Sequence, residues 1–156
     1  MSHWVQIKGI IQQGYGVASG RAGDPRFPGG TIEMQKPAFA ARGLNLEQYF
    51  PGTINVSIHP HQYAIKQAKY TFRNVQWALE RPSEDFSFFD CRVTLSNGSR
   101  VEGLIYYPHP ETKPEHFQNP EIIELILPFV EGLQYGNELL LEVNPEQIEI
   151  NYQKSI

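Results

Sequence analysis

The sequence predicts a single, mainly β domain that spans residues 1–156, most simply a small barrel with one or two short helices. Three observations support this prediction. The 156 residues are enough for one hydrophobic core. Thirteen glycines and twelve prolines are spread along the chain and divide it into short elements. Several of those elements alternate apolar and polar residues, which is the pattern of half-buried strands.

The first third of the chain predicts a strand, a long loop and a helix. Residues 4–11 alternate, and their odd positions give a mostly apolar face. Residues 14–30 hold six glycines and two prolines, and we favour a functional loop there because structureless loops of this length are usually functional or disordered. A helix is expected over residues 33–42, interrupted by Pro37 and ended by Gly43. One side of that helix carries Met34, Ala38, Ala41 and Leu44.

The middle of the chain predicts a β meander. Residues 53–58 alternate cleanly, with Ile54, Val56 and Ile58 on one face. Residues 70–79 and 86–95 are rich in aromatic and β-branched residues, which favour strands. The pair Asn97-Gly98 is typical of a tight hairpin turn before another strand over residues 100–107.

The last third predicts a loop, a buried element and a final strand. Residues 108–120 contain four prolines and read as a loop. Residues 122–127 form a buried element around Glu124, and residues 139–143 a last strand. Residues 144–156 are expected to be a tail of uncertain order.

Charge and cysteine content exclude several partners and favour a location. Thirteen basic against seventeen acidic residues give a net charge of −4, which argues against nucleic acid and an anionic membrane as partners. The longest apolar stretches are too short to cross a bilayer. Cys91 is the single cysteine, so no intramolecular disulfide can form, and a cytoplasmic location is expected.

A magnesium site is the first chemical hypothesis. Thr53 and Asn55 are two residues apart on a predicted strand, so their side chains share a face. A hydroxyl and an amide oxygen suit Mg²⁺, which keeps several waters and takes further ligands from phosphate. The alternative is that both are ordinary polar residues on a solvated strand face.

A phosphate-binding loop is the second hypothesis. The run Gly14-Tyr15-Gly16-Val17-Ala18-Ser19-Gly20 follows a predicted strand directly. Backbone N–H groups can approach a polyphosphate closely where side chains are absent. The run lacks the lysine of a Walker motif, and a flexible turn is the alternative.

A carboxylate pair is the third hypothesis. On a helix, Glu121 and Glu124 would share a face, and a partly buried glutamate has the raised pKa that a general base needs. Glu121 is also explained as the first residue of a helix that follows Pro120. Glu124 lies between Ile123 and Leu125 and is harder to explain structurally.

Two other groups favour structural explanations. His59 and His61 could share a strand face, but Pro60 between them indicates a strand end, so solvated histidines are favoured over a metal site. Cys91 lies inside a predicted strand and is expected to be a buried structural thiol.

The three hypotheses occur in an order that resembles a known family. The order of three motifs resembles that of the archaeal CTP-dependent riboflavin kinases. The motifs are the glycine run, then Pro51-Gly52-Thr53-Ile54-Asn55, then residues 120–128 with Glu121 and Glu124. The likeness runs from about Gly9 to Val143. It implies a six-stranded cradle-loop β barrel and transfer of a nucleotide γ-phosphate to riboflavin, giving FMN.

The resemblance also implies roles for individual residues. Gly14, Tyr15, Gly16 and Val17 would wrap the nucleotide phosphates, and Thr53 and Asn55 would bind Mg²⁺. Glu124 would be the catalytic base, and Glu121 and Glu124 would lie at the flavin. An acidic chain that binds a triphosphate also needs cations, for which the candidates are Arg21, Arg26, Lys36 and Arg42.

Three functions therefore remain in competition. The first is a riboflavin kinase with CTP as the suspected donor and Mg²⁺ as its cofactor. The second is a non-catalytic nucleotide- or flavin-binding barrel that has lost kinase activity. The third is a barrel that binds other proteins.

Overall fold

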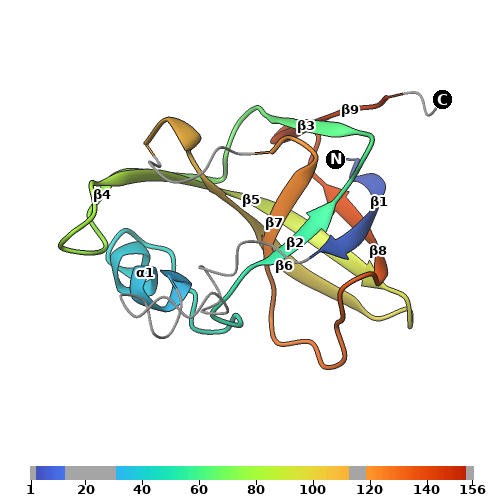
Figure 1. Ribbon diagram of the computed structural model, residues 1–156, viewed down its shortest axis with the longest axis horizontal. Coiled ribbons are helices and arrows are strands. Elements are labelled where there is room, and N and C mark those ends of the chain that lie inside the picture. The colour runs from blue at the N-terminus through green and yellow to red at the C-terminus, as the bar shows by residue number, and fades with distance from the viewer. Residues whose placement is uncertain (1–2, 13–30, 113–118, 154–156) are drawn as a thin grey trace.

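The computed structural model describes residues 3–12, 31–112 and 119–153, and it contains a closed antiparallel barrel of six strands (Figure 1). Around the barrel the strands follow the order β5, β6, β7, β2, β1, β8, and pairing of β8 with β5 closes it. Their bounds are β1 Val5–Gln12, β2 Ile54–Ser57, β5 Glu84–Leu95, β6 Arg100–Pro108, β7 Ile122–Ile126 and β8 Glu138–Val143. The predicted mainly β barrel is confirmed.

Three further strands and two helical elements complete the described part of the chain. Strand β4 (Tyr70–Val75) extends the sheet beyond β5. Strands β3 (Gln62–Ile65) and β9 (Ile148–Asn151) form a separate two-stranded sheet. Helix α1 spans Thr31–Ala40, and a 3₁₀ turn, η1, spans Pro110–Thr112. None of the helices among the described residues is long and apolar enough to cross a membrane.

Strict alternation fills the barrel. In β1, the odd positions Ile7, Gly9 and Ile11 are buried while the even positions are exposed, as the sequence predicted. The interior cluster is the set of buried side chains inside the barrel, and it includes Val56, Phe89, Cys91, Ile123, Leu125 and Leu141. Close approach of β6 to β7 depends on Gly103, because a Cβ there would lie 2.5 Å from the Ile126 carbonyl oxygen.

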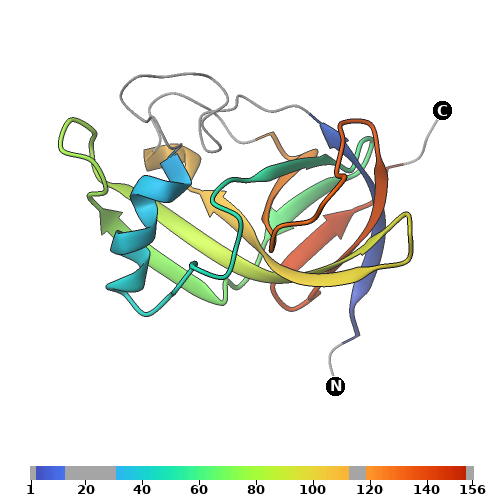
Figure 2. The same cartoon turned by 90° about the horizontal axis from the view of Figure 1, so that it is seen from below.

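A second apolar cluster lies outside the barrel, beneath α1. The helix packs beside the projecting ends of β4 and β5, away from β8 (Figures 1 and 2). The outer cluster is the set of buried apolar side chains that α1 and the segment after it form with the outer side of β4, β5, β6 and β7: Ile32, Phe39, Leu44, Leu46, Val75, Trp77, Phe86, Phe88, Leu104, Tyr106 and Ile126. The alternating strands therefore contribute one face to each cluster.

Helix α1 corrects two expectations. It runs through Pro37 without interruption, and Ala41 N–H donates to the Pro37 carbonyl oxygen at 3.0 Å. Its most buried side is formed by Ile32, Gln35, Lys36 and Phe39, whereas Ala41 is exposed. The predicted end is confirmed, because Gly43 adopts a φ of +103°, the left-handed conformation typical of a residue that follows a helix.

Two other expectations change. The buried element around Glu124 is strand β7, so the helix that would have placed Glu121 and Glu124 on one face does not form. The segment after Val143, expected as a tail, contains strand β9, whose Ile148 is buried in the interior cluster. Strand β3, to which β9 pairs, was not anticipated either.

Candidate functional site

The barrel places Asn55 directly opposite Glu124. These residues are register partners in the antiparallel pair of β2 and β7. Their strand neighbours Val56, Ile123 and Leu125 lie in the interior cluster, so Asn55 and Glu124 project from the outer face of the barrel. Directly opposed residues have Cβ atoms about 4.5–5.5 Å apart. The strand pairing thus joins two of the hypotheses, the metal ligand and the general base.

The amide oxygen of Asn55 lies in an unusual environment. Asn55 Oδ1 is buried and has no hydrogen-bond partner among the described residues. A buried acceptor without a partner costs free energy, about 1–3 kcal/mol, and such an atom calls for an explanation. A cation bound at this oxygen would supply the missing interaction, so the residue fits the Mg²⁺ ligand that the sequence predicted.

Tyr106 lies beside Glu124 on its other side. The two are register partners between β6 and β7, and the Tyr106 hydroxyl donates to Gln35 Oε1 of α1 at 2.8 Å. Burial raises the pKa of Tyr106 well above its ordinary value, and the carboxylates of Glu124 and Glu84 raise it further. The hydroxyl therefore stays protonated next to Glu124. Tyr106 and Gln35 are site residues that sequence reasoning missed.

A buried ion pair between Arg81 and Glu84 lies beside the outer cluster. Glu84 accepts hydrogen bonds from Trp77 Nε1 at 2.9 Å and from Arg81 Nη2 at 3.2 Å. Both charged side chains are almost fully buried. The Arg81 guanidinium also stacks over the Trp77 ring, 4.9 Å from its centroid. Buried polar groups therefore lie directly against the aromatic rings of the outer cluster.

The structure separates Glu121 from Glu124. Glu121 precedes β7, and its carboxylate is 3.0 Å from His59 Nδ1. His61 Nδ1 accepts the backbone N–H of Gln153. Both histidines thus have a partner within the fold, and the preference for solvated histidines over a metal site stays a prediction. Contact of Glu121 with a flavin stays a prediction.

Thr53 immediately precedes β2 and is partly buried, two residues before Asn55. The predicted phosphate loop, Gly14, Tyr15, Gly16 and Val17, lies outside the described residues. The last described residue before it is Gln12, which is the register partner of Asn55 on β1. Strand β1 therefore reaches the Asn55–Glu124 pair just before the glycine run in the sequence.

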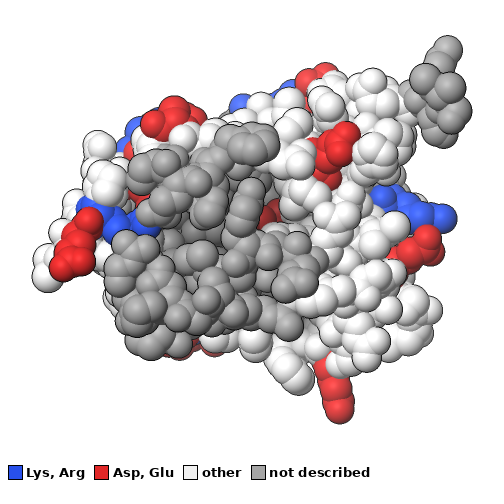
Figure 3. All heavy atoms as spheres, viewed as in Figure 1, with Lys and Arg blue, Asp and Glu red and all other residues white. Residues whose placement is uncertain are grey.

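The candidate cations have other partners where the structure describes them. Lys36 Nζ is 3.4 Å from Glu33 and 3.6 Å from Glu47, and Arg42 donates to the Ala38 carbonyl oxygen. Arg21 and Arg26 lie outside the described residues. On the face seen in Figure 3, the described lysine and arginine side chains lie apart and form no single basic patch. Among described residues, no group of three or more His, Cys, Asp or Glu is arranged to hold a metal.

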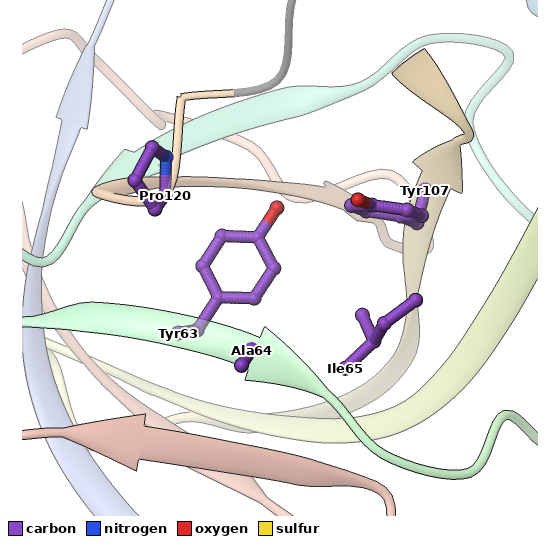
Figure 4. Close-up of a pocket in the computed structure, with 5 residues that line it drawn as sticks. All are labelled: Tyr63, Ala64, Ile65, Tyr107 and Pro120. Carbon is purple, nitrogen blue, oxygen red and sulfur yellow. The ribbon is translucent and has the colours of Figure 1, made fainter. Parts of the chain in front are cut away.

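A small cavity lies elsewhere, between β3 and the barrel. It measures about 70 Å³ and is lined by Tyr63, Ala64, Ile65, Tyr107 and Pro120. Tyr63 lies between Pro120 and Tyr107 (Figure 4). Ligand pockets usually measure about 300–1,000 Å³, so this cavity is too small for a flavin or a nucleotide.

A serine–histidine–glutamate chain was also missed by sequence reasoning. Ser87 Oγ is 2.7 Å from His109 Nε2, and His109 Nδ1 is 3.1 Å from Glu111 Oε1. This order of groups resembles a nucleophilic triad. Ser87 is only 1% exposed, however, and its hydroxyl is also hydrogen-bonded to Thr71. This series of hydrogen bonds therefore connects β4, β5 and η1 within the fold.

Cys91 is buried in the interior cluster, as predicted, and burial raises the pKa of its thiol.

No protein-family model matches the chain, and no curated protein matches it. Any assignment of function therefore rests on the motifs and on the geometry around Asn55 and Glu124.

Proposed function

We propose that the protein is a riboflavin kinase that transfers the γ-phosphate of a nucleoside triphosphate, with CTP as the suspected donor, to riboflavin. The observation that carries the proposal is the direct opposition of Asn55 and Glu124, with Asn55 Oδ1 buried and lacking a partner among the described residues. A predicted cation ligand and a predicted base thus lie side by side on neighbouring strands.

The reaction needs positioning and charge neutralisation more than covalent chemistry by the protein. The 5′-hydroxyl oxygen of riboflavin attacks the γ-phosphorus, and the bond from that phosphorus to the β–γ bridging oxygen breaks. Glu124 accepts the hydroxyl proton, and the products are FMN and a nucleoside diphosphate. Glu124 also orients the hydroxyl before the attack.

Thr53 and Asn55 would hold Mg²⁺, which when bound neutralises negative charge on the phosphates. Asn55 supplies the amide oxygen and Thr53 the hydroxyl. Tyr106 faces Glu124 from the neighbouring strand β6, and its hydroxyl is held by Gln35. The phosphates would be wrapped by the glycine run, Gly14, Tyr15, Gly16 and Val17. A cytoplasmic location is part of the same proposal.

The test replaces Glu124 with glutamine, which keeps the shape of the side chain and removes its charge. Riboflavin and Mg²⁺–nucleotide should still bind in calorimetric titrations. FMN formation should fall by about 10²–10⁴-fold, because this is what acid–base assistance contributes to a rate. Glu149→Gln is the matched control, since Glu149 is exposed on β9.

The wild-type protein is first assayed with riboflavin, Mg²⁺ and each of the four common nucleoside triphosphates. Absence of FMN with all four would contradict the kinase proposal. Retained flavin or nucleotide binding in that case would favour the non-catalytic binding barrel.

A further inference from the structure

Two phenylalanine rings remain exposed at one end of the β2–β7 pair. Phe50 is 46% exposed and Phe129 is 72% exposed. Their ring centroids lie 6.2 Å apart, with an angle of 42° between the ring planes. Neither ring belongs to the interior cluster or the outer cluster. Folding thus leaves an aromatic pair at the surface, with ring area open to a ligand.

Backbone hydrogen bonds fix this pair to the candidate site. The Phe50 N–H donates to the Leu127 carbonyl oxygen at 2.9 Å, just beyond the end of β7. The Gly52 N–H donates to the Phe50 carbonyl oxygen, which closes the turn that leads into Thr53. Phe129 follows Leu127 by two residues. Both rings are therefore held near the start of β2, on the side of Thr53.

The order of groups along the strands matches the order of groups in phosphoryl transfer. Glu124 and Asn55 come first, Thr53 follows towards the start of β2, and the aromatic pair lies beyond Thr53. Leu127 is three residues from Glu124, about 10 Å at the rise of a strand. The acceptor, the transferred phosphoryl group and the leaving nucleotide lie roughly in line. With the acceptor at Glu124 and the phosphates at Thr53 and Asn55, the pair lies where the donor nucleoside would extend.

The sequence around Phe129 favours an uncharged ligand group. Glu131 follows it closely, and no lysine or arginine occurs between Pro128 and Lys154. Phe50 and Phe129 themselves offer ring faces and no hydrogen-bonding side-chain atoms. A planar heterocycle can stack on such faces, whereas a phosphate group gains nothing from them.

We propose that Phe50 and Phe129 form a stacking platform for the nucleobase of the phosphate donor, an inference that rests on the proposed kinase function. Stacking on aromatic side chains tolerates every base because every base has a π-face. The platform therefore contributes affinity for the base of either CTP or ATP, and any preference for CTP comes from other contacts.

The experiment measures binding by calorimetry in the presence of Mg²⁺, with CTP, ATP, inorganic tripolyphosphate and riboflavin as separate ligands. The variants are Phe129→Ala, Phe129→Tyr and, as a control, Tyr152→Ala, which removes an exposed ring elsewhere. Phe129→Ala should weaken CTP and ATP binding by about tenfold or more, the usual effect of losing one stacked ring. Phe129→Tyr keeps a ring and should restore both, while tripolyphosphate affinity stays unchanged in every variant.

The outcomes separate this inference from the kinase proposal. If nucleotides and tripolyphosphate bind but Phe129→Ala changes neither, the platform is wrong and the phosphate site stands. If Phe129→Ala weakens riboflavin alone, the platform belongs to the acceptor and the inference is overturned. If the wild type binds neither nucleotide nor tripolyphosphate, both proposals fail together.

Discussion

The interior cluster and the outer cluster are both buried, yet they are built from different side chains. The interior cluster is mostly aliphatic, with residues such as Val56, Leu125 and Leu141. The outer cluster is richer in aromatic side chains, and Phe39 makes edge contacts at 5.1 Å with both Phe86 and Phe88. Polar groups lie against that outer cluster, including Gln35, Glu84 and the Tyr106 hydroxyl.

This difference shows how one set of strands serves two purposes. Alternation sends every second side chain of β2, β6 and β7 into the barrel and the others outwards. The inward side chains stabilise the closed sheet by burying apolar surface. The outward side chains are then free to hold polar groups in a partly dry environment, where hydrogen bonds and charges act more strongly than in water. Glu124, Asn55 and Tyr106 all belong to the outward set.

The largest expected effect comes from the interior. Leu125→Ala removes a fully buried side chain next to Glu124 in the sequence. The free energy of unfolding should fall by about 2–5 kcal/mol, because the substitution leaves a cavity in a closed barrel. Urea unfolding followed by circular dichroism measures the loss. Leu79→Ala is the control, since Leu79 is 99% exposed and should change stability by about 0.5 kcal/mol or less. Equal effects of the two variants would mean that the interior is not close-packed.

A smaller, pH-dependent effect is expected from the outer cluster at Tyr106. Removing its hydroxyl in Tyr106→Phe leaves the buried Gln35 amide oxygen without this donor and should cost about 1–3 kcal/mol at neutral pH. Folding raises the pKa of Tyr106, so the folded protein keeps a proton that the unfolded chain releases. The associated stability is complete below about pH 10, the ordinary tyrosine pKa, and is lost as the pH rises from there towards the folded-state pKa.

Unfolding free energies measured from pH 8 to pH 11 test this sign. The wild type should lose stability with rising pH more steeply than Tyr106→Phe above about pH 10. Burial also raises the pKa of Cys91, so part of the alkaline loss should remain in the variant. Identical slopes for the two proteins would contradict a buried, protonated Tyr106.

How far the sequence predicts this molecule depends on whether the signal is local. Apolar residues recur with a period of two at Ile7 and Ile11 and at Ile54 and Val56. This pattern correctly predicted which side chains of β1 and β2 face the interior of the barrel. The short apolar run around Glu124 fits a helix or a strand equally well by pattern, and only pairing with β2 and β6 decides between them.

The missed site residues depend on contacts between distant parts of the chain. Tyr106 and Gln35 are 71 residues apart, and no local pattern signals that their side chains meet. Strands β3 and β9 are four residues each and, among the described strands, pair with one another alone, so neither carries a strong signal of its own. The opposition of Asn55 and Glu124 is likewise a matter of register, although each residue was singled out separately from the sequence.

The smallest expected effect on stability, and the sharpest on function, is at Asn55. Asn55→Leu replaces a buried amide oxygen that has no partner among the described residues. Because such an oxygen costs free energy, the apolar variant should be as stable as the wild type or more stable, by up to about 1 kcal/mol. Mg²⁺–nucleotide binding should weaken by about 1–3 kcal/mol, the cost of losing one charge-assisted contact.

Asn55→Asp provides the opposite change at the same position. Without Mg²⁺ it should be less stable than the wild type, because a second carboxylate then faces Glu124 across the strand pair. Adding Mg²⁺ should recover that loss, since a cation bound at the pair stabilises only the folded protein. Thermal unfolding of both variants with and without Mg²⁺ measures these effects. If Asn55→Leu is clearly destabilised while nucleotide affinity is unchanged, Asn55 stabilises the fold. The proposal of a metal site on the outer face of the β2–β7 pair is then wrong.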